Sequence, residues 1–137
     1  MMFTALLDYE RYQARLCCLR LWPDFVGYGF NLHADRSKTG QFIGKVDVPS
    51  PAQKSGLREG DRIIEVNGIS VVEKSHPEVV TLVKSRQGEV DMLVVDREAD
   101  EHFRSHGVQV NKSMPGVVTI TCPASNPYAA GEKSDLK

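Results

Sequence analysis

Apolar and polar residues alternate along several short segments of the chain, with the period of two that is typical of β-strands. The clearest of these segments cover residues 15–21, 30–34, 41–46, 62–66 and 89–95, and a shorter one covers 69–72. Between two of them, Asn67-Gly68 is a strong signal of a tight hairpin turn. The pattern therefore predicts a mainly β fold.

Two helices are predicted between the strands, because each begins with recognisable capping residues. Ser50 precedes Pro51 and is followed by Gln53 three positions later. Ser75 is followed in the same way by Glu78. A hydroxyl residue with Glu or Gln three positions later is the capping-box pattern, and proline is well tolerated in the first helical turn.

The second predicted helix, over residues 76–86, has two apolar faces. At 100° per residue, His76, Val80 and Val83 fall within about 60° of one another, whereas Val79 and Leu82 point elsewhere. One apolar face is enough for a helix that only covers a core. We therefore expect the face that begins with His76 to contact something other than the core.

The sequence Gly27-Tyr28-Gly29-Phe30 leads directly into the strand predicted over residues 30–34. Two glycines in such a turn can adopt backbone conformations that other residues avoid, so that successive N–H groups converge on an anion. Tyr28 and Phe30 add apolar surface beside it. An anion-binding loop next to an apolar pocket suits the C-terminal residue of a polypeptide. Taken alone, however, these four residues are more typical of an ordinary turn before a strand.

In this order, the elements resemble a PDZ domain over roughly residues 14–96. The 27–30 loop, the start of the first helix at Ser50, the segment 60–68 and His76 at the start of the second helix each fall where a PDZ domain has them. The resemblance implies a mainly β fold, a partly open antiparallel sandwich with two helices.

A narrower similarity links the chain to the sodium–hydrogen exchanger regulatory factors, which are scaffolds carrying tandem PDZ domains under membrane transporters and receptors. It rests on residues 15–19, 27–34, 93–96 and 100–103. The sequence also departs from that family. Gly44 stands where the scaffolds often have an arginine, the segment before Gly27 is longer and contains Trp22 and Phe25, and one such domain is present in this chain.

The resemblance implies that a partner's C-terminus adds as a strand between the 30–34 strand and the 76–86 helix. Backbone N–H groups of residues 28–30 would hold its carboxylate. His76 would accept a hydrogen bond from a Ser or Thr two residues before the end. The implied peptide-binding residues are Gly27, Tyr28, Gly29, Phe30, Asn31, Leu32, His33, His76, Val80 and Val83.

The implied partners are C-terminal tails of membrane transporters, channels or receptors, and the implied location is the cytoplasm at the inner face of the plasma membrane. Lys and Arg total 17 against 18 Asp and Glu, so no overall field attracts nucleic acid or membrane. No apolar run approaches the ~18 residues that span a bilayer. The three cysteines lack the spacing of a disulfide framework or a zinc site.

We expect no cofactor, no metal and no catalytic activity. His102 and His106 have helical spacing for a metal pair, but no third ligand is placed by spacing. No serine and acid are placed around His76 to suggest a catalytic triad.

Outside the domain, we expect an N-terminal extension over residues 1–13, a docking helix within 97–107 held by Ala99 and Phe103, and a flexible C-terminal tail over 108–137. Two alternative functions remain open. One is self-association through the N-terminal apolar residues or through residues 117–121, which have high strand propensity. The other is weak phosphoinositide binding by a basic patch of Arg36, Lys38, Lys45, Lys54 and Arg58.

Overall fold

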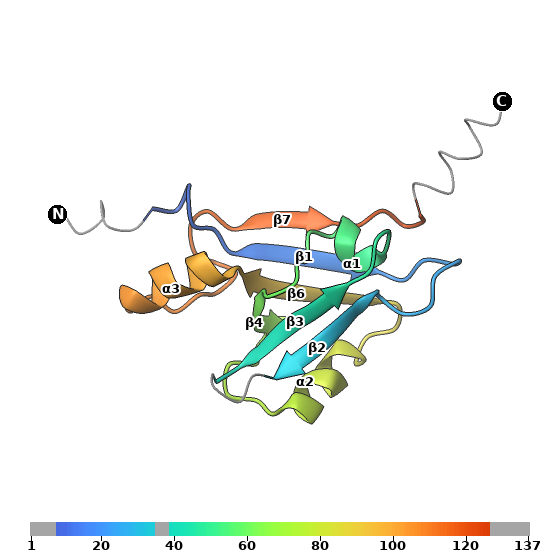
Figure 1. Ribbon diagram of the computed structural model, residues 1–137, viewed down its shortest axis with the longest axis horizontal. Coiled ribbons are helices and arrows are strands. Elements are labelled where there is room, and N and C mark those ends of the chain that lie inside the picture. Colours follow the sequence, from blue (N-terminus) through green and yellow to red (C-terminus); the bar gives the residue numbers. More distant parts are fainter. Residues whose placement is uncertain (1–7, 35–38, 127–137) are drawn as a thin grey trace.

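The computed structural model of the chain describes residues 8–34 and 39–126. Within these residues, seven strands and three helices are formed (Figure 1). The strands are β1 (Arg15–Arg20), β2 (Phe30–Ala34), β3 (Gln41–Val46), β4 (Arg62–Val66), β5 (Ile69–Ser70), β6 (Glu89–Val95) and β7 (Val118–Thr121). The helices are α1 (Pro51–Lys54), α2 (His76–Val83) and α3 (Arg97–Ser105).

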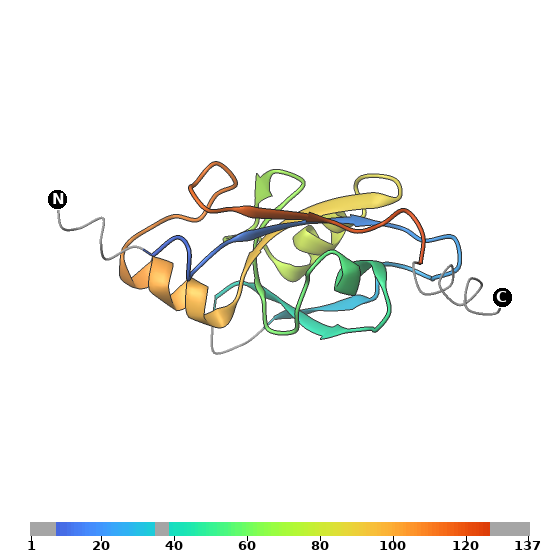
Figure 2. The same cartoon turned by 90° about the horizontal axis from the view of Figure 1, so that it is seen from above.

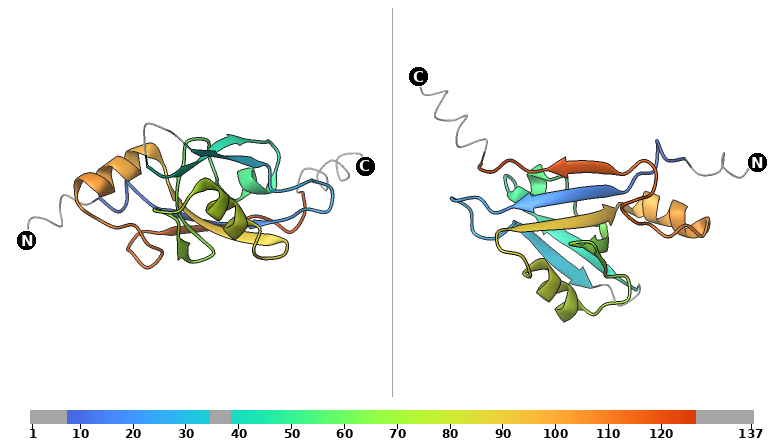
Figure 3. Two further views of the ribbon diagram at one scale, coloured as in Figure 1. Left: turned by 90° about the horizontal axis from the view of Figure 1, so that it is seen from below. Right: turned by 180° about the vertical axis from the view of Figure 1, so that it is seen from behind.

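The strands follow the order β2-β3-β4-β6-β1-β7, and β5 pairs with β4. All pairs are antiparallel except β1 with β7. Seen from above, β1, β6 and β7 form one layer, and β2 and β3 form the layer opposite (Figure 2). The second helix, α2, lies beside β2 at an open side of this sandwich (Figure 3). The predicted fold, a partly open β-sandwich with helices, is confirmed.

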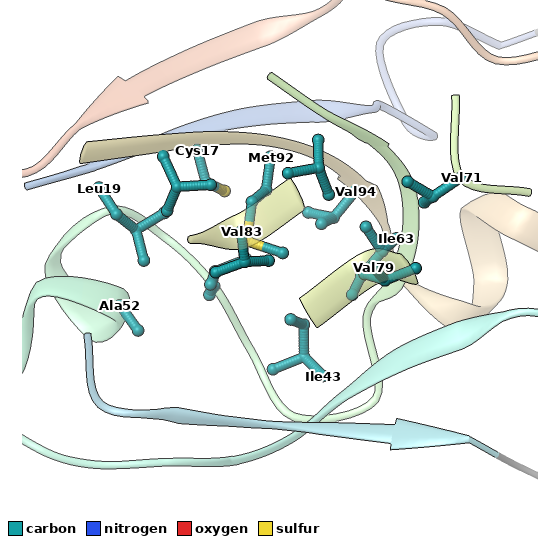
Figure 4. Packing of buried hydrophobic residues seen from close by; sticks show 13 residues of the cluster. Cys17, Leu19, Ile43, Ala52, Ile63, Val71, Val79, Val83, Met92 and Val94 are labelled. Carbon is teal, nitrogen blue, oxygen red and sulfur yellow. The ribbon is translucent and has the colours of Figure 1, made fainter. Parts of the chain in front are cut away.

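The main core lies between the two layers and α2. The side chains of β1 and β6 that alternate inward, Cys17 and Met92 among them, meet Val79 and Val83 of α2 there (Figure 4). Burial raises the pKa of the Cys17 thiol to about 12, so this cysteine is a core residue rather than a reactive one.

A second apolar cluster lies beneath α3. Ala99 and Phe103, four residues apart on α3, are fully buried against Leu93 and Val95 of β6. The Asp96 side chain caps the helix by accepting the N–H of Ala99 at 2.8 Å. Ala99 and Phe103 thus pack α3 (Arg97–Ser105), which lies within the range expected for a docking helix, against the sheet.

The segment after α3 differs from the flexible tail expected over residues 108–137. Val108, Val110, Met114 and Val117 pack on the second cluster, as do Tyr9 and Tyr12 of the N-terminal extension. The strand expected at 117–121 forms as β7 and pairs with β1 at the edge of the sheet. The expectation is wrong for residues 108–126, because a parallel pairing across about a hundred residues leaves no local signal in composition. Residues 1–7 and 127–137 lie outside the described part of the chain.

Two hydrogen bonds continue the attachment of this segment beyond β7. The N–H of Cys122 donates to the carbonyl oxygen of Cys18 at 3.0 Å. The indole N–H of Trp22 donates to the carbonyl oxygen of Pro123 at 2.9 Å. Trp22 thus joins the end of the C-terminal segment to the loop that leads to Gly27. No helix among residues 8–34 and 39–126 is long and apolar enough to cross a membrane.

Truncation after Gly116 should lower the free energy of unfolding by about 3 kcal/mol or more, because it removes the half-buried Val118 and Ile120 and the Trp22 hydrogen bond. Urea denaturation followed by circular dichroism measures this loss. Truncation after Asn126 is the matched control and should leave the midpoint unchanged. Equal stability of the two truncated proteins would show that β7 is not an integral strand.

Candidate functional site

A groove of about 570 Å³ runs between β2 and α2. It lies at the edge of the sheet, because β2 pairs with β3 on one side and has no strand on the other within the described residues. Its walls are apolar along the middle, where Phe30 and Leu32 of β2 face Val80 and Val83 of α2. The full lining is Leu21, Gly27, Tyr28, Phe30, Asn31, Leu32, His76, Val80, Val83, Lys84, Arg86 and Gly88.

This lining contains all the predicted peptide-binding residues except Gly29 and His33. His33 is exposed and lines a different cavity, of about 970 Å³, between the outer face of β2 and β3 and helix α3. The reason is the alternation of side chains along a strand: Phe30 and Leu32 point into the groove, so His33 points away from it. Asn31 borders both cavities.

The larger cavity also bears on the expected basic patch. Lys45 and Arg58 line it, but so do Glu59, Glu98 and Glu101. Charges of both signs therefore alternate there, which gives no concentrated positive potential for a phosphoinositide headgroup. Arg36 and Lys38, the other end of that patch, lie outside the described residues.

The 27–30 loop closes one end of the groove in a left-handed backbone conformation, with φ of 76° at Gly27 and 90° at Gly29. Two of its carbonyl groups bond to α1 and to the segment that leads into it. The oxygen of Tyr28 accepts the N–H of Ala52 at 2.9 Å, and that of Gly29 accepts the N–H of Asp47 at 2.8 Å. The N–H groups of Tyr28 and Gly29 have no acceptor within residues 8–34 and 39–126. The loop therefore offers backbone donors at the end of an apolar groove.

Gly29 supports the loop rather than lining the groove. A Cβ atom at this position would lie 2.4 Å from Cβ of Ser50 and 2.6 Å from its Oγ. Ser50 is itself fixed: its Oγ donates to the carbonyl oxygen of Asp47 at 2.7 Å and accepts the N–H of Gln53 at 3.1 Å. The cap of α1 and the 27–30 loop are thus packed together as one unit.

Four residues of the groove were not predicted: Leu21, Lys84, Arg86 and Gly88. Lys84, the C-cap residue of α2, follows Val80 by four positions, so helical spacing alone places it on the same side of the helix as His76. The other three depend on how the β1–β2 and α2–β6 connections fold, and no sequence pattern indicates their position.

An ion-pair network that includes the groove residue Arg86 lies at the end of the groove near the 27–30 loop. The Arg86 guanidinium contacts Glu89 at 2.5 Å and Asp91 at 3.3 Å, and Arg20 contacts Glu89 at 3.1 Å. The hydrogen bond from Arg86 lowers the pKa of the Glu89 carboxyl group. Burial raises the pKa of Tyr28, an effect that the Glu89 carboxylate adds to and the Arg86 guanidinium opposes. Carboxylates thus balance the charge of Arg86, whereas Lys84 adds an exposed ammonium group.

His76 stands at the other end of the groove, at the first position of α2. A capping box holds this position, since Ser75 and Glu78 exchange hydrogen bonds between side chain and backbone. The imidazole Nδ1 lies 2.9 Å from Oε1 of Gln41, the first residue of β3. This contact leaves Nε2 as the nitrogen free to meet a ligand.

His102 and His106, which have helical spacing for a metal pair, lie on α3 and at its C-cap, outside the groove. Among the described residues, no group of three or more His, Cys, Asp or Glu side chains is arranged to hold a metal ion. His102 instead stacks on Tyr12 with ring centroids 4.1 Å apart, and its Nε2 accepts the N–H of Asp8 at 3.3 Å. This histidine helps to dock the N-terminal extension on α3.

The profile of the PDZ domain family matches residues 26–95, which is half of the chain. The chain therefore belongs to the PDZ domain family. A solved structure supports the fold: the chain is similar to a PDZ domain from choanoflagellate SHANK1 bound to a GIRK3 peptide, with a TM-score of 0.56 and 29% identity, over 63% of this chain and 94% of that one.

Among curated proteins, the chain is similar to Na(+)/H(+) exchange regulatory cofactor NHE-RF2 of Mus musculus, with 56% identity over 89% of this chain and 38% of the relative. It is 52% identical to the Oryctolagus cuniculus NHE-RF2 over 84% of this chain and 38% of that protein. It is 42% identical to Na(+)/H(+) exchange regulatory cofactor NHE-RF1 of Gallus gallus, over 86% of this chain and 33% of that protein. The chain thus spans between a third and two fifths of the length of these relatives.

Gly29→Ala should destabilise the protein more than Gly60→Ala. Both glycines have a φ near 90°, which costs alanine about 1–2 kcal/mol, but a Cβ at Gly60 meets nothing within 4 Å. The contact with Ser50 should add about 1–3 kcal/mol of overpacking at Gly29. Urea denaturation of both variants measures the difference. Equal losses would mean that the loop and the α1 cap are not tightly packed.

Proposed function

We propose that this chain is a binding module that captures the C-terminal segment of a partner protein as an additional strand on the free edge of β2. One observation carries the proposal: the groove beside that edge ends at a loop whose N–H donors have no acceptor in the described chain. A chain terminus supplies both of the missing parts. Its backbone pairs with β2, and its carboxylate accepts the loop N–H groups.

Each wall of the groove then has a role in recognition. The N–H groups of Tyr28, Gly29 and Phe30 hold the terminal carboxylate. The apolar residues Phe30, Leu32, Val80 and Val83 surround the last side chain, which is therefore apolar. The ammonium group of Lys84 adds a favourable charge near the bound carboxylate.

His76 supplies the selectivity for the third-last residue. The groove runs from the 27–30 loop to the start of α2. We propose that a strand anchored by its carboxylate in the loop brings its third-last side chain beside the imidazole. A Ser or Thr hydroxyl at that position donates to the neutral imidazole. The preferred ligands therefore end in Ser or Thr, any residue, and an apolar residue.

The relatives indicate which proteins carry such termini. Their names describe regulatory cofactors of Na(+)/H(+) exchange, and the PDZ domain of the similar structure is bound to a GIRK3 peptide. We therefore propose that the partners are tails of membrane transporters, channels or receptors. Binding to such tails would place the chain in the cytoplasm at the inner face of the plasma membrane, as an adaptor rather than an enzyme.

His76→Val should weaken binding of a peptide with Thr at the third-last position by roughly two- to tenfold, because one hydrogen bond to a hydroxyl is worth about 0.5–1.5 kcal/mol. Affinity for the same peptide with Val at that position should be unchanged or higher. Isothermal titration calorimetry of both proteins with both peptides measures the difference.

His33→Val is the matched control, because His33 lies on the same strand as the groove residues but faces away from the groove. Any effect of this change should be equal for the two peptides. The proposed ligand class would have to be withdrawn if His76→Val weakened both peptides equally, since His76 would then only support the helix.

A further inference from the structure

Gln41 is a buried polar residue whose side chain contacts His76, a residue of the groove lining. Its residue surface is 6% exposed, and the hydrogen bond of its side chain joins Oε1 to the His76 imidazole. Other buried polar residues serve the fold: Ser50 caps α1, and Arg62 pairs with Asp100 to hold α3. Gln41 begins β3, behind the groove wall, with Ala34 of β2 as its partner in the sheet.

The contact with Gln41 favours one of the two neutral forms of His76. A neutral imidazole has one N–H donor and one acceptor nitrogen. An amide oxygen can only accept, so with Oε1 2.9 Å from Nδ1 the proton belongs on Nδ1. Nε2, on the other side of the ring, then carries the lone pair. A Ser or Thr hydroxyl that donates to the histidine needs this arrangement.

We propose that Gln41 is a positioning residue that holds His76 in the Nδ1–H tautomer and thereby sets the selectivity of the groove for a hydroxyl donor. This inference rests on the proposed function. The inference names the residue outside the groove lining, Gln41, on which the selectivity for a hydroxyl donor depends. A carbonyl or carboxylate partner often fixes the tautomer of a functional histidine in this way.

No other described group makes a hydrogen bond to the imidazole. On α2 and the turn before it, the charged neighbours are Glu73, Lys74 and Glu78. Glu78 accepts the backbone N–H of Ser75 at 2.8 Å. From β2, the groove residues near the ring are uncharged. The cations of the groove, Lys84 and Arg86, lie two or more helical turns further along. Asp35, Arg36 and Lys38, between β2 and β3, lie outside the described residues.

Two variants separate positioning from packing. Gln41→Met keeps the length of the side chain but removes the oxygen. Gln41→Glu keeps an oxygen acceptor and adds a negative charge, which favours the imidazolium form. The first readout is the tautomer of His76 in the free protein, from long-range ¹H–¹⁵N correlation spectra at a pH where the imidazole is neutral. The second is the ratio of affinities for the Thr and Val peptides.

We expect the Nδ1–H tautomer in the unsubstituted protein and in Gln41→Glu, and a mixture with more Nε2–H in Gln41→Met. Gln41→Met should reduce the preference for the Thr peptide roughly two- to tenfold while sparing the Val peptide. Gln41→Glu should retain the preference for the Thr peptide at a pH where the His76 imidazole is neutral. As pH falls, it should lose the preference at a higher pH than the unsubstituted protein, because imidazolium has no lone pair.

The inference is overturned by an Nε2–H tautomer in the unsubstituted protein. It is also overturned if Gln41→Met leaves the tautomer unchanged or weakens both peptides equally, which a purely structural role would produce. These outcomes leave the proposed function standing, because both peptides still bind. Failure of the unsubstituted protein to bind either peptide would instead reject the proposed function, and this inference with it.

Discussion

The groove depends on the contact between the 27–30 loop and the start of α1. The carbonyl groups of Tyr28 and Gly29 bond to the backbone of residues 52 and 47, and Gly29 leaves no room for a side chain against Ser50. With its oxygens held on one side, the loop keeps its N–H groups on the other. A flexible loop would lose conformational entropy on binding an anion, whereas this one is already ordered.

The rest of the fold brings complementary surfaces to that loop. β2 is the edge strand, so its backbone is available for pairing, and α2 stands beside it with an apolar face directed away from Val79. The capping box of α2 fixes His76 at the far end of the groove, and Gln41 contacts its ring from β3. At the opposite edge of the sheet, β7 covers β1, and Trp22 ties this added segment to the chain that leads into the loop.

Much of this was predictable, because the decisive signals are local. The spacing of glycines and aromatics in residues 27–30, the caps of both helices and the two apolar faces of α2 are each visible within a few residues. The strand alternation that directs Phe30 and Leu32 into the groove also directs His33 to the opposite face, so the prediction of His33 as a groove residue conflicts with the alternation itself. The pairing of β7 with β1 and the contact of Gln41 with His76 join residues far apart in sequence, and no periodicity or composition encodes them.

The central claim is that the loop N–H groups bind a terminal carboxylate, and a pair of peptides tests it most directly. One peptide ends in a free acid, and its twin ends in an amide with one additional N-terminal aspartate, so that net charge is equal. The account predicts that the amide binds at least about tenfold more weakly, because a charge-assisted acceptor is lost and buried donors are left unpaired. Equal affinities for the two peptides would contradict it.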